Sequence, residues 1–469
     1  MLFNSLSFVF FFVAVFAIYY LPFVKKWQLP FLVIVSTYFY GTAYWKATAI
    51  LLISILVNTI ISYKVSTDKK QNVKAWLFLG IAFNLATLFF FKYIKLFTLT
   101  FIDSSLHAQP FFHFLILVPL PIGVSFFTFE GISLLVDSYK QKEVQGIIKN
   151  QSFYSHFIRS SLFISFFPHL IAGPILKADQ FIPQIGIKYF KNINWEKVFK
   201  QLILGYFLKM VVADNLKDIT ADLIYPFEIY HPITLITLLF GYSIQIFADF
   251  AGYSLIALGL ASLLGYDLIN NFNFPYISKS FSEFWTRWHI SLSRWLKEYL
   301  YIPLGGNRKG VLRTYFNLFI VMFLGGLWHG ATWNFALWGT VHGLAIAIER
   351  LISNYFKPNN TTWYKALKVI LVFTVVSFAW LFFKLLTIHE VVNFYKALAP
   401  AYWHGFTLSN REWYVFFYCL PVLFYYILYL LRNRYTLTIN KLEPFLYAVL
   451  LFLILSNAGF SGNFIYFRF

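Results

Sequence analysis

Long apolar runs recur along the whole chain, and they restrict its possible folds more than any other feature. The first runs from Phe8 to Pro22 and the last from Phe445 to Ser456. A bilayer core of roughly 30 Å needs about 20 apolar residues per helix. Hydrophobic residues make up 59% of the chain and charged residues only 12%, which is not the composition of a soluble domain. The pattern predicts a polytopic integral membrane protein.

Helices are expected to form the whole fold. We expect an all-α protein with roughly 11 to 13 transmembrane helices and additional amphipathic or re-entrant helices. The polar stretches, such as Tyr63 to Lys74 and Asp137 to Gln151, are no longer than loops. We therefore expect one membrane-embedded domain over residues 1–469, with its motifs in about 120–349. The first apolar run has no basic residue before it, so it should remain as a spanning helix rather than be cleaved as a signal peptide.

The positive charge of the chain predicts its topology. The net charge is +19, and in membrane proteins Lys and Arg collect in cytoplasmic loops, an explanation we favour over nucleic-acid binding. Basic residues follow the first and the third apolar runs: Lys25, Lys26, Lys64, Lys69, Lys70 and Lys74. We expect these loops to be cytoplasmic and both the N-terminus and the C-terminal segment 464–469 to be extracytoplasmic.

Two histidines, His289 and His329, lie in apolar or amphipathic surroundings, where a titratable group is costly and needs a reason. The residues from 285 to 301 mix Trp and Tyr with Arg and Lys, which is typical of an amphipathic helix at the headgroup level. His329 lies between Gly326 and Gly330, at the turn between two apolar segments. The run from Phe316 to Leu327 is short for a full crossing, so we expect His329 at membrane depth or near the outer face. A neutral imidazole tolerates burial and suits acid–base catalysis.

Gln245 and Asp249 carry the only side-chain amide and carboxylate in the largely apolar segment from Gly241 to Gly265. Their spacing of four places them on one helix face. A carboxylate in hydrocarbon is costly, so Asp249 should face the protein interior or a water-filled cavity. Hydrogen bonding between helices and a role in a site explain the pair equally well.

Several common catalytic motifs are absent from the sequence. There is no Walker loop and no G-x-S-x-G elbow. His389-Glu390 resembles the start of a zinc-protease motif, but Asn393 stands where the second histidine is required, and Cys419 is the lone cysteine. We expect no bound metal and no bound cofactor.

Longer motifs resemble the membrane-bound O-acyltransferase family, specifically the bacterial branch typified by the membrane subunit of alginate O-acetyltransferase. Three stretches carry most of this resemblance: QIFADFAGYS at Gln245–Ser254, NFNFPYISKSFSEFWTRWHISLSRWLKEYLYIPLGGNR at Asn271–Arg308, and LGGLWHGATWNFALWG at Leu324–Gly339. Thr286 and Leu255 depart from the family pattern by lacking polar groups common there, which weakens an ion-pair or donor-binding role for their neighbours. Neither change touches His289 or His329.

The resemblance implies a set of site residues and an architecture. His329 would be the catalytic histidine and His289 the second polar position, in helices that surround a tunnel through the membrane. Donor-binding or supporting roles would fall to Gln245, Asp249, Arg287, Trp288, Ser291, Trp328 and Asn334. His342 is more simply explained as a packed, hydrogen-bonded histidine.

The same resemblance implies a function. The protein would move an acetyl group from a cytoplasmic thioester donor, acetyl-CoA, for O-acetylation of an extracytoplasmic polysaccharide such as an alginate-like exopolysaccharide or peptidoglycan. It would act in the bacterial cytoplasmic membrane, in contact with lipid, with a separate extracytoplasmic SGNH-type esterase or transferase as its partner and no nucleic acid. The alternatives are D-alanyl transfer for teichoic acid, an acyltransferase for a lipid or protein acceptor, and a non-catalytic polysaccharide or substrate transporter.

Overall fold

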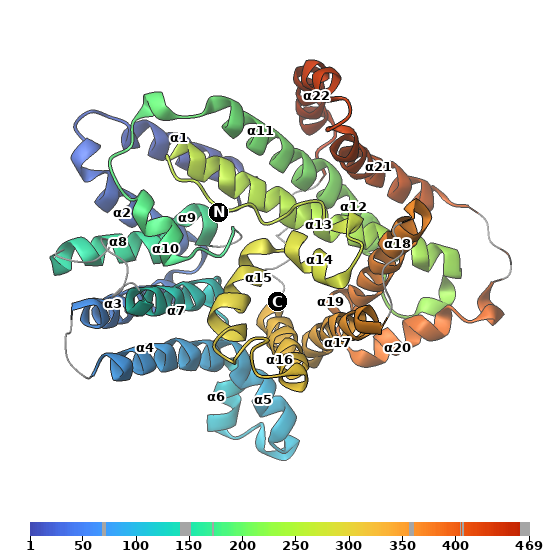
Figure 1. Cartoon of the computed structure of the whole chain (residues 1–469), viewed down its shortest axis with the longest axis horizontal. Helices are drawn as coiled ribbons and strands as arrows, with labels where there is room; N and C mark the ends of the chain where they lie inside the picture. Colours follow the sequence, from blue (N-terminus) through green and yellow to red (C-terminus); the bar gives the residue numbers. More distant parts are fainter. Residues whose placement is uncertain are drawn as a thin grey trace. The chain divides into compact units, whose positions relative to one another are not determined.

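The computed structural model describes residues 1–67, 72–140, 152–170, 173–355, 361–403, 405 and 408–459 (Figure 1). Helix accounts for 79% of the structure, and the described residues contain no β-strand. The predicted all-α class is therefore confirmed. Lys69, Lys70 and the segment 464–469, which were used to predict the topology, lie outside the described residues.

The chain divides into two compact units. The first comprises Met1–Val198 with Ala257–Ile269, and the second comprises Phe199–Ile256 with Asn270–Phe469. Helix α13 (Pro232–Leu263) contributes residues to both. The expectation of one domain over residues 1–469 stays a prediction.

The first unit contains ten α-helices in its described residues before the chain passes to the second. These are α1 (Leu6–Tyr19), α2 (Gln28–Ala43), α3 (Trp45–Thr67), α4 (Val73–Leu88), α5 (Ile94–Phe101), α6 (Pro110–Leu117), α7 (Val124–Lys140), α8 (Phe153–Ser165), α9 (Phe167–Leu170) and α10 (Ala178–Phe181). Helices α3, α4 and α7 pack together around a core that includes Ile61, Val65 and Leu135. Asn58 and Asn84 exchange amide hydrogen bonds of 3.1 and 2.7 Å inside this core.

Helix α7 carries a polar face that supports a non-helical segment of the chain. Ser133 accepts a hydrogen bond of 3.2 Å from the backbone N–H of Ala178, and Asp137 accepts one of 3.3 Å from that of Asp179. The non-helical residues 174–177 just before them are buried. Irregular backbone is tolerated in a membrane protein where protein groups satisfy it, and α7 supplies such groups.

The second unit holds the remaining helices. These are α11 (Trp195–Tyr206), which begins in the first unit, the π-helical segment η6 (Phe207–Ala213), α12 (Asp214–Thr220), most of α13, α14 (Phe281–Arg287), α15 (Ile290–Leu296), α16 (Val311–His329), α17 (Trp333–Tyr355), α18 (Thr362–Ala379), α19 (Leu381–Lys384), α20 (Ile388–Ala397), α21 (Asn410–Leu431) and α22 (Thr436–Ser456).

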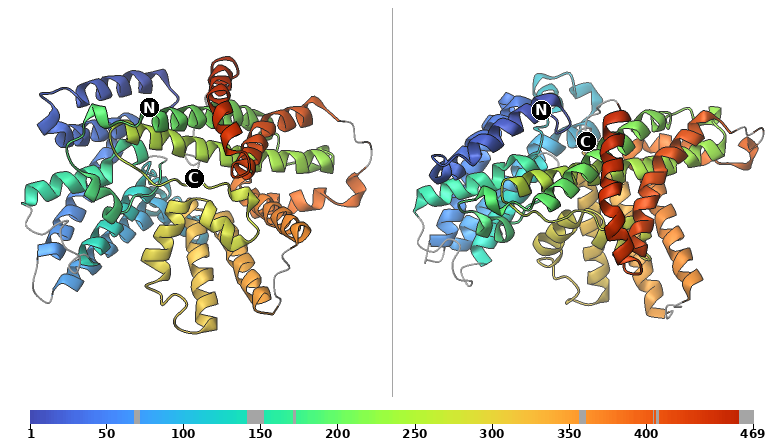
Figure 2. Two further views of the ribbon diagram at one scale, coloured as in Figure 1. Left: turned by 45° about the horizontal axis from the view of Figure 1, so that its top comes forward. Right: turned by 90° about the horizontal axis from the view of Figure 1, so that it is seen from above.

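Helices α16 and α17 run side by side (Figures 1 and 2). Two glycines allow this close approach. A Cβ at Gly326 would collide with the backbone oxygen of Phe335, and a Cβ at Gly339 would collide with that of Met322. Small residues let helix backbones approach closely in membranes. The contact fixes the end of α16, where His329 is the last residue.

Eight described helices are long and apolar enough to cross a membrane, and α1 is a shorter apolar helix. The predicted total of roughly 11 to 13 transmembrane helices is larger than the eight candidates found in the described residues. The short crossing expected from Phe316 to Leu327 is wrong, because α16 begins at Val311 and has 19 residues. The first turn of this helix includes Arg313.

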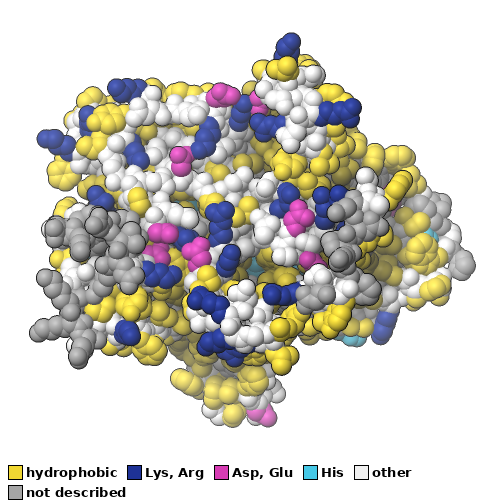
Figure 3. Space-filling view, in the orientation of Figure 1, with side chains coloured by type: hydrophobic (Ala, Val, Ile, Leu, Met, Phe, Trp, Pro, Cys, Tyr) yellow, Lys and Arg dark blue, Asp and Glu magenta, His cyan; other side chains and the backbone are white. Residues whose placement is uncertain are grey.

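The surface is apolar where lipid would lie. Figure 3 shows hydrophobic side chains gathered along parts of the margin of the face in view, with Lys and Arg side chains scattered over its middle. Helix α22 is the extreme case, since none of its spanning window is buried, and Leu437 and Leu455 are each 80% exposed. Such a helix is stable only in an apolar surrounding, which agrees with the predicted membrane location.

Candidate active site

Helix α13 is anchored in the second unit by a buried ion-pair network. The Nζ atom of Lys209, in the π-helical segment η6, lies 2.7 Å from an oxygen of Asp249 on α13 and 2.7 Å from an oxygen of Asp214 on α12. One turn earlier on α13, Gln245 accepts a hydrogen bond of 2.5 Å from the hydroxyl of Thr220. Both predicted polar residues of α13 therefore connect helices.

The residue after Asp249 links this network to the first candidate histidine. The ring of Phe250 contacts the ring of His289 edge-on, with 4.7 Å between centroids. Phe272 packs against both Phe250, at 4.9 Å, and Trp288, at 5.0 Å. His289 is fully buried behind these aromatic rings.

The chain bends sharply at His289. Helix α14 ends at Arg287 and α15 begins at Ile290, and His289 between them has φ 42° and ψ 55°. This left-handed conformation is rare for residues other than glycine, although histidine is among those that adopt it more often. The expected amphipathic helix over 285–301 is therefore interrupted. The bend turns His289 inward and buries Trp288, Leu292 and their neighbours instead of laying the segment on a surface.

His329 approaches His289 from the end of α16. The two imidazole centroids are 6.2 Å apart, and both side chains are buried. Trp338 and Phe383 contact the ring of His329 at 5.1 and 5.2 Å. Trp328 contacts both histidines, at 6.0 and 5.2 Å. Two imidazoles in an aromatic enclosure of this kind are suited to moving a proton and binding a polar substrate group away from bulk water.

Comparisons with known proteins identify relatives of this chain. The model of the MBOAT, membrane-bound O-acyltransferase family, matches residues 149–389. The chain is 36% identical over 428 residues to the peptidoglycan O-acetyltransferase of Helicobacter pylori, covering 85% of this chain and 80% of that protein.

The chain belongs to the membrane-bound O-acyltransferase family. It is also 36% identical over 407 residues to a Pseudomonas putida protein named "Probable alginate O-acetylase AlgI", covering 85% of this chain and 80% of that one. A teichoic acid D-alanyltransferase of Bacillus subtilis is 29% identical over 288 residues, covering 56% of this chain. The protein is thus a multi-pass membrane O-acyltransferase, and both histidines lie in the matched range.

The supporting residues predicted for this acyltransferase fall into two groups. Trp328 contacts both histidine rings, Trp288 directly precedes His289 in the chain, and Ser291 lies in the first turn of α15 after it. Asn334 instead donates a hydrogen bond of 2.9 Å to the backbone oxygen of Leu385, which holds the start of α17. Gln245 and Asp249 make the interhelical contacts described above.

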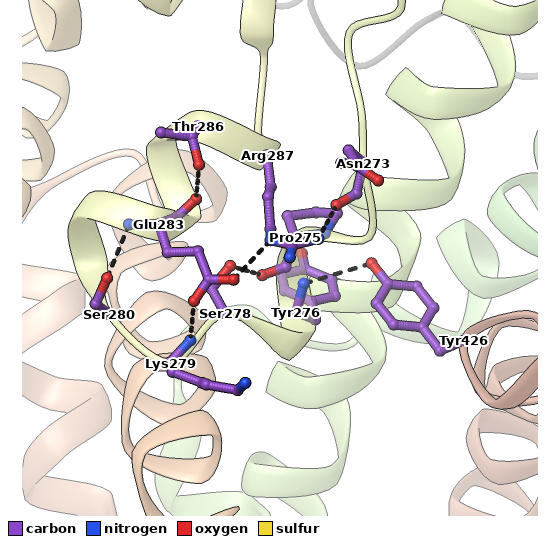
Figure 4. Close-up of polar contacts among 10 residues, drawn as sticks. All are labelled: Asn273, Pro275, Tyr276, Ser278, Lys279, Ser280, Glu283, Thr286, Arg287 and Tyr426. Atoms are coloured by element: carbon purple, nitrogen blue, oxygen red, sulfur yellow. Dashed lines mark hydrogen bonds and ion pairs between the residues drawn. The ribbon is translucent and has the colours of Figure 1, made fainter. Parts of the chain in front are cut away.

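Arg287 is engaged with other groups of the acyltransferase. Its Nε donates to Glu283 at 2.9 Å, and its Nη1 donates to the backbone oxygen of Asn273 at 3.0 Å (Figure 4). The backbone N–H of Asn273 in turn donates to the oxygen of Arg287 at 2.9 Å. The arginine thus stabilises the antiparallel pairing of residues 271–273 with 287–291.

His342 of the acyltransferase is packed as expected, but without the expected hydrogen bonds. Its ring lies parallel to that of Phe284, 6.0 Å away, and edge-on to Trp338 at 4.6 Å. Neither ring nitrogen has a hydrogen-bond partner among the described residues. Among all the residues that the structure describes, no group of three or more His, Cys, Asp or Glu side chains is placed to hold a metal ion.

Sequence reasoning missed four residues that shape this site: Lys209, Asp214, Asn271 and Glu283. The sequence did contain a sign that Lys209 is paired. Lys209 stands inside an apolar run with Asp214 five residues later, and charges within membrane helices usually pair. Asn271 and Glu283 stood inside the quoted family motif without any feature that marked their partners.

Proposed function

We propose that this acyltransferase supports O-acetylation of an extracytoplasmic cell-surface polysaccharide, with acetyl-CoA as the donor on the cytoplasmic side. The proposal is carried by one observation: two buried histidines meet in an aromatic enclosure, 6.2 Å between ring centroids. Two relatives, named a peptidoglycan O-acetyltransferase and a probable alginate O-acetylase, support the acetyl group and the polysaccharide class.

In this proposal His329 is the general base. A neutral ring nitrogen of His329 accepts the proton of the acceptor hydroxyl as its oxygen attacks the carbonyl carbon of the thioester. The C–O bond forms, the C–S bond breaks, and the thiolate leaves and takes up a proton. His289, across the site from His329, positions the donor thioester. Trp288, Trp328 and Ser291 support the pair, whereas Gln245, Asp249, Arg287 and Asn334 hold the surrounding helices.

The location and partners belong to the same proposal. The enzyme acts in the bacterial cytoplasmic membrane, surrounded by lipid, with its termini on the extracytoplasmic side. A separate extracytoplasmic SGNH-type protein completes delivery to the polymer. The excess of basic residues after the first apolar run, at Lys25 and Lys26, supports this orientation by the positive-inside rule.

D-alanyl transfer is a second candidate function, because the chain also matches a teichoic acid D-alanyltransferase over 56% of its length. The match to the peptidoglycan O-acetyltransferase covers 85% of it, which favours acetyl transfer. Cells can be supplied with radiolabelled acetyl or D-alanyl precursor, and the label on the envelope polymer then separates the two.

Replacement of His329 tests the catalytic assignment. His329→Ala should abolish acetylation of the envelope polymer, while the protein stays at its normal abundance in the membrane. The matched control is His389→Ala, since His389 is an exposed histidine on α20 and should be dispensable. Polymer acetylation that survives His329→Ala at normal abundance would overturn the assignment.

A further inference from the structure

The left-handed backbone at His289 requires a group that imposes it. Phe274 and His289 are the residues other than glycine that have a positive φ in the described part of the chain. The conformation is disfavoured for L-residues because Cβ crowds the following carbonyl oxygen. It persists where surrounding structure determines it, and such positions cluster at functional sites.

Asn271 supplies two hydrogen bonds to the residues directly after His289. Its backbone oxygen accepts from the N–H of Ile290 at 3.0 Å, and its side-chain Oδ1 accepts from the N–H of Ser291 at 3.2 Å. These N–H groups belong to the first turn of α15, where a helix offers them no internal partner. Asn271 is fully buried, so water does not compete for either bond.

The neighbours of Asn271 are the wall of the histidine site. Phe272, the next residue, contacts both Phe250 and Trp288, and Phe250 contacts the His289 ring. A shift of Asn271 would therefore move the backbone that follows His289 and the rings that enclose its imidazole.

We infer that Asn271 is a positioning residue for acyl transfer, whose side-chain oxygen holds His289 in the left-handed conformation that brings its ring to that of His329. The inference rests on the function proposed above for His289. It assigns no contact with substrate to Asn271.

Loss of the side-chain acceptor is the first test. In permeabilised cells supplied with radiolabelled acetyl-CoA, Asn271→Ala should lower the maximal rate of polymer labelling about 10- to 100-fold, the scale of a small misplacement of a catalytic group. The acetyl-CoA concentration at half-maximal rate should change little. Asn271→Asp keeps an oxygen acceptor and should restore most of the rate. Asp that is no better than Ala would overturn the inference.

Asn273 provides a matched control two residues away. Its side chain is exposed, and in both hydrogen bonds with Arg287 the atom of Asn273 that takes part belongs to the backbone. Asn273→Ala should therefore retain the wild-type rate. A loss as large as that of Asn271→Ala would mean that the segment is merely sensitive to mutation, which contradicts a specific role for Asn271.

A double-mutant cycle tests the link to His289 without measuring activity. Glycine adopts the left-handed conformation freely. The hydrogen bond accepted by the Asn271 side chain should therefore contribute less to stability in the His289→Gly variant. Asn271→Ala should lower the thermal midpoint of the detergent-purified protein more in the wild type than in the His289→Gly background. Should Asn271→Ala alone fail to accumulate in the membrane, addition of His289→Gly should restore accumulation.

The possible outcomes separate this inference from the proposed function. Equal drops in thermal midpoint in both backgrounds, or no restored accumulation, overturn the role of Asn271 even if His329→Ala is inactive. Retained acetylation by His329→Ala overturns the proposed function, whereas the stability cycle still reports whether Asn271 braces His289.

Discussion

Removal of the positive charge from Lys209 should destabilise the protein more than removal of either carboxylate that contacts it. Lys209, Asp214 and Asp249 have side chains that are only 1%, 1% and 5% exposed. With one positive and two negative groups, the cluster carries a net charge of −1. Lys209→Met leaves −2 in a buried site, whereas Asp249→Asn or Asp214→Asn leaves a neutral pair.

The expected sizes follow from this charge balance. Leaving a buried charge without its partner costs about 3–5 kcal/mol, and Lys209→Met leaves two such carboxylates repelling each other. Asp249→Asn keeps an oxygen acceptor for Lys209 and loses mainly the charge assistance of one hydrogen bond, about 1.5–3 kcal/mol. The triple variant that replaces all three residues with Met, Asn and Asn has no buried charge and should recover much of the loss.

The thermal midpoint of the detergent-purified protein and its abundance in membranes measure this order. The control is the ion pair between Lys200 Nζ and Glu443 Oε2, which are 2.8 Å apart on side chains that are each about one-third exposed. Lys200→Met should cost less than about 1 kcal/mol. The reasoning is refuted if Lys209→Met is no less stable than Asp249→Asn. If Asp249→Asn instead loses activity at unchanged stability, Asp249 serves the substrate and not the helix contact.

Two further predictions concern the backbone and titration of the site. Gly326→Ala and Gly339→Ala should each lower stability and acetylation, because the added Cβ atom would collide with the backbone of the facing helix. Gly186 has open space around it, so Gly186→Ala should change neither stability nor acetylation. His289 lies outside the candidate spans, and burial lowers its pKa from 6.5 to about 3. The neutral imidazole therefore contributes its full stabilisation of the folded protein above pH 6.5, and this stabilisation is lost as the pH falls toward 3. The thermal midpoint should therefore drop more between pH 7 and pH 5 in the wild type than in His289→Asn; equal drops would contradict the buried neutral imidazole.

The fold class and the placement of His329 could be predicted because both depend on local sequence. Apolar runs of spanning length need only their own composition to be recognised as helices. Likewise, His329 was expected at the turn between two apolar segments, and it is the last residue of α16, four residues before α17 begins. The glycines on either side of the turn also fit this hairpin, since close helix approach needs small residues.

The bend at His289 could not be predicted in the same way. Residues 285–301 have the composition of one amphipathic helix, and nothing in their spacing marks a left-handed residue. The residues after His289 donate hydrogen bonds to Asn271, which precedes His289 by 18 positions, and the His289 ring packs against Phe250. Such long-range contacts override local propensity. The partners of Asp249 were missed for the same reason, since Lys209 is 40 residues away in sequence.

The hydrogen bonding of buried polar groups identifies those that support the fold more sharply than burial does. Gln245, Asp249 and Asn334 are all buried, yet each has a protein partner within 3 Å. His289 is equally buried, but neither of its ring nitrogens has a hydrogen-bond partner among the described residues. A buried polar group left in this way costs about 1–3 kcal/mol, a cost that selection for stability alone would remove by placing an apolar residue there. His342 is buried with both ring nitrogens left in the same way, so what distinguishes His289 is its left-handed backbone next to the hydrogen bonds accepted by Asn271 and its ring 6.2 Å from that of His329. This combination supports the role proposed above, in which a substrate group completes the hydrogen bonds of His289.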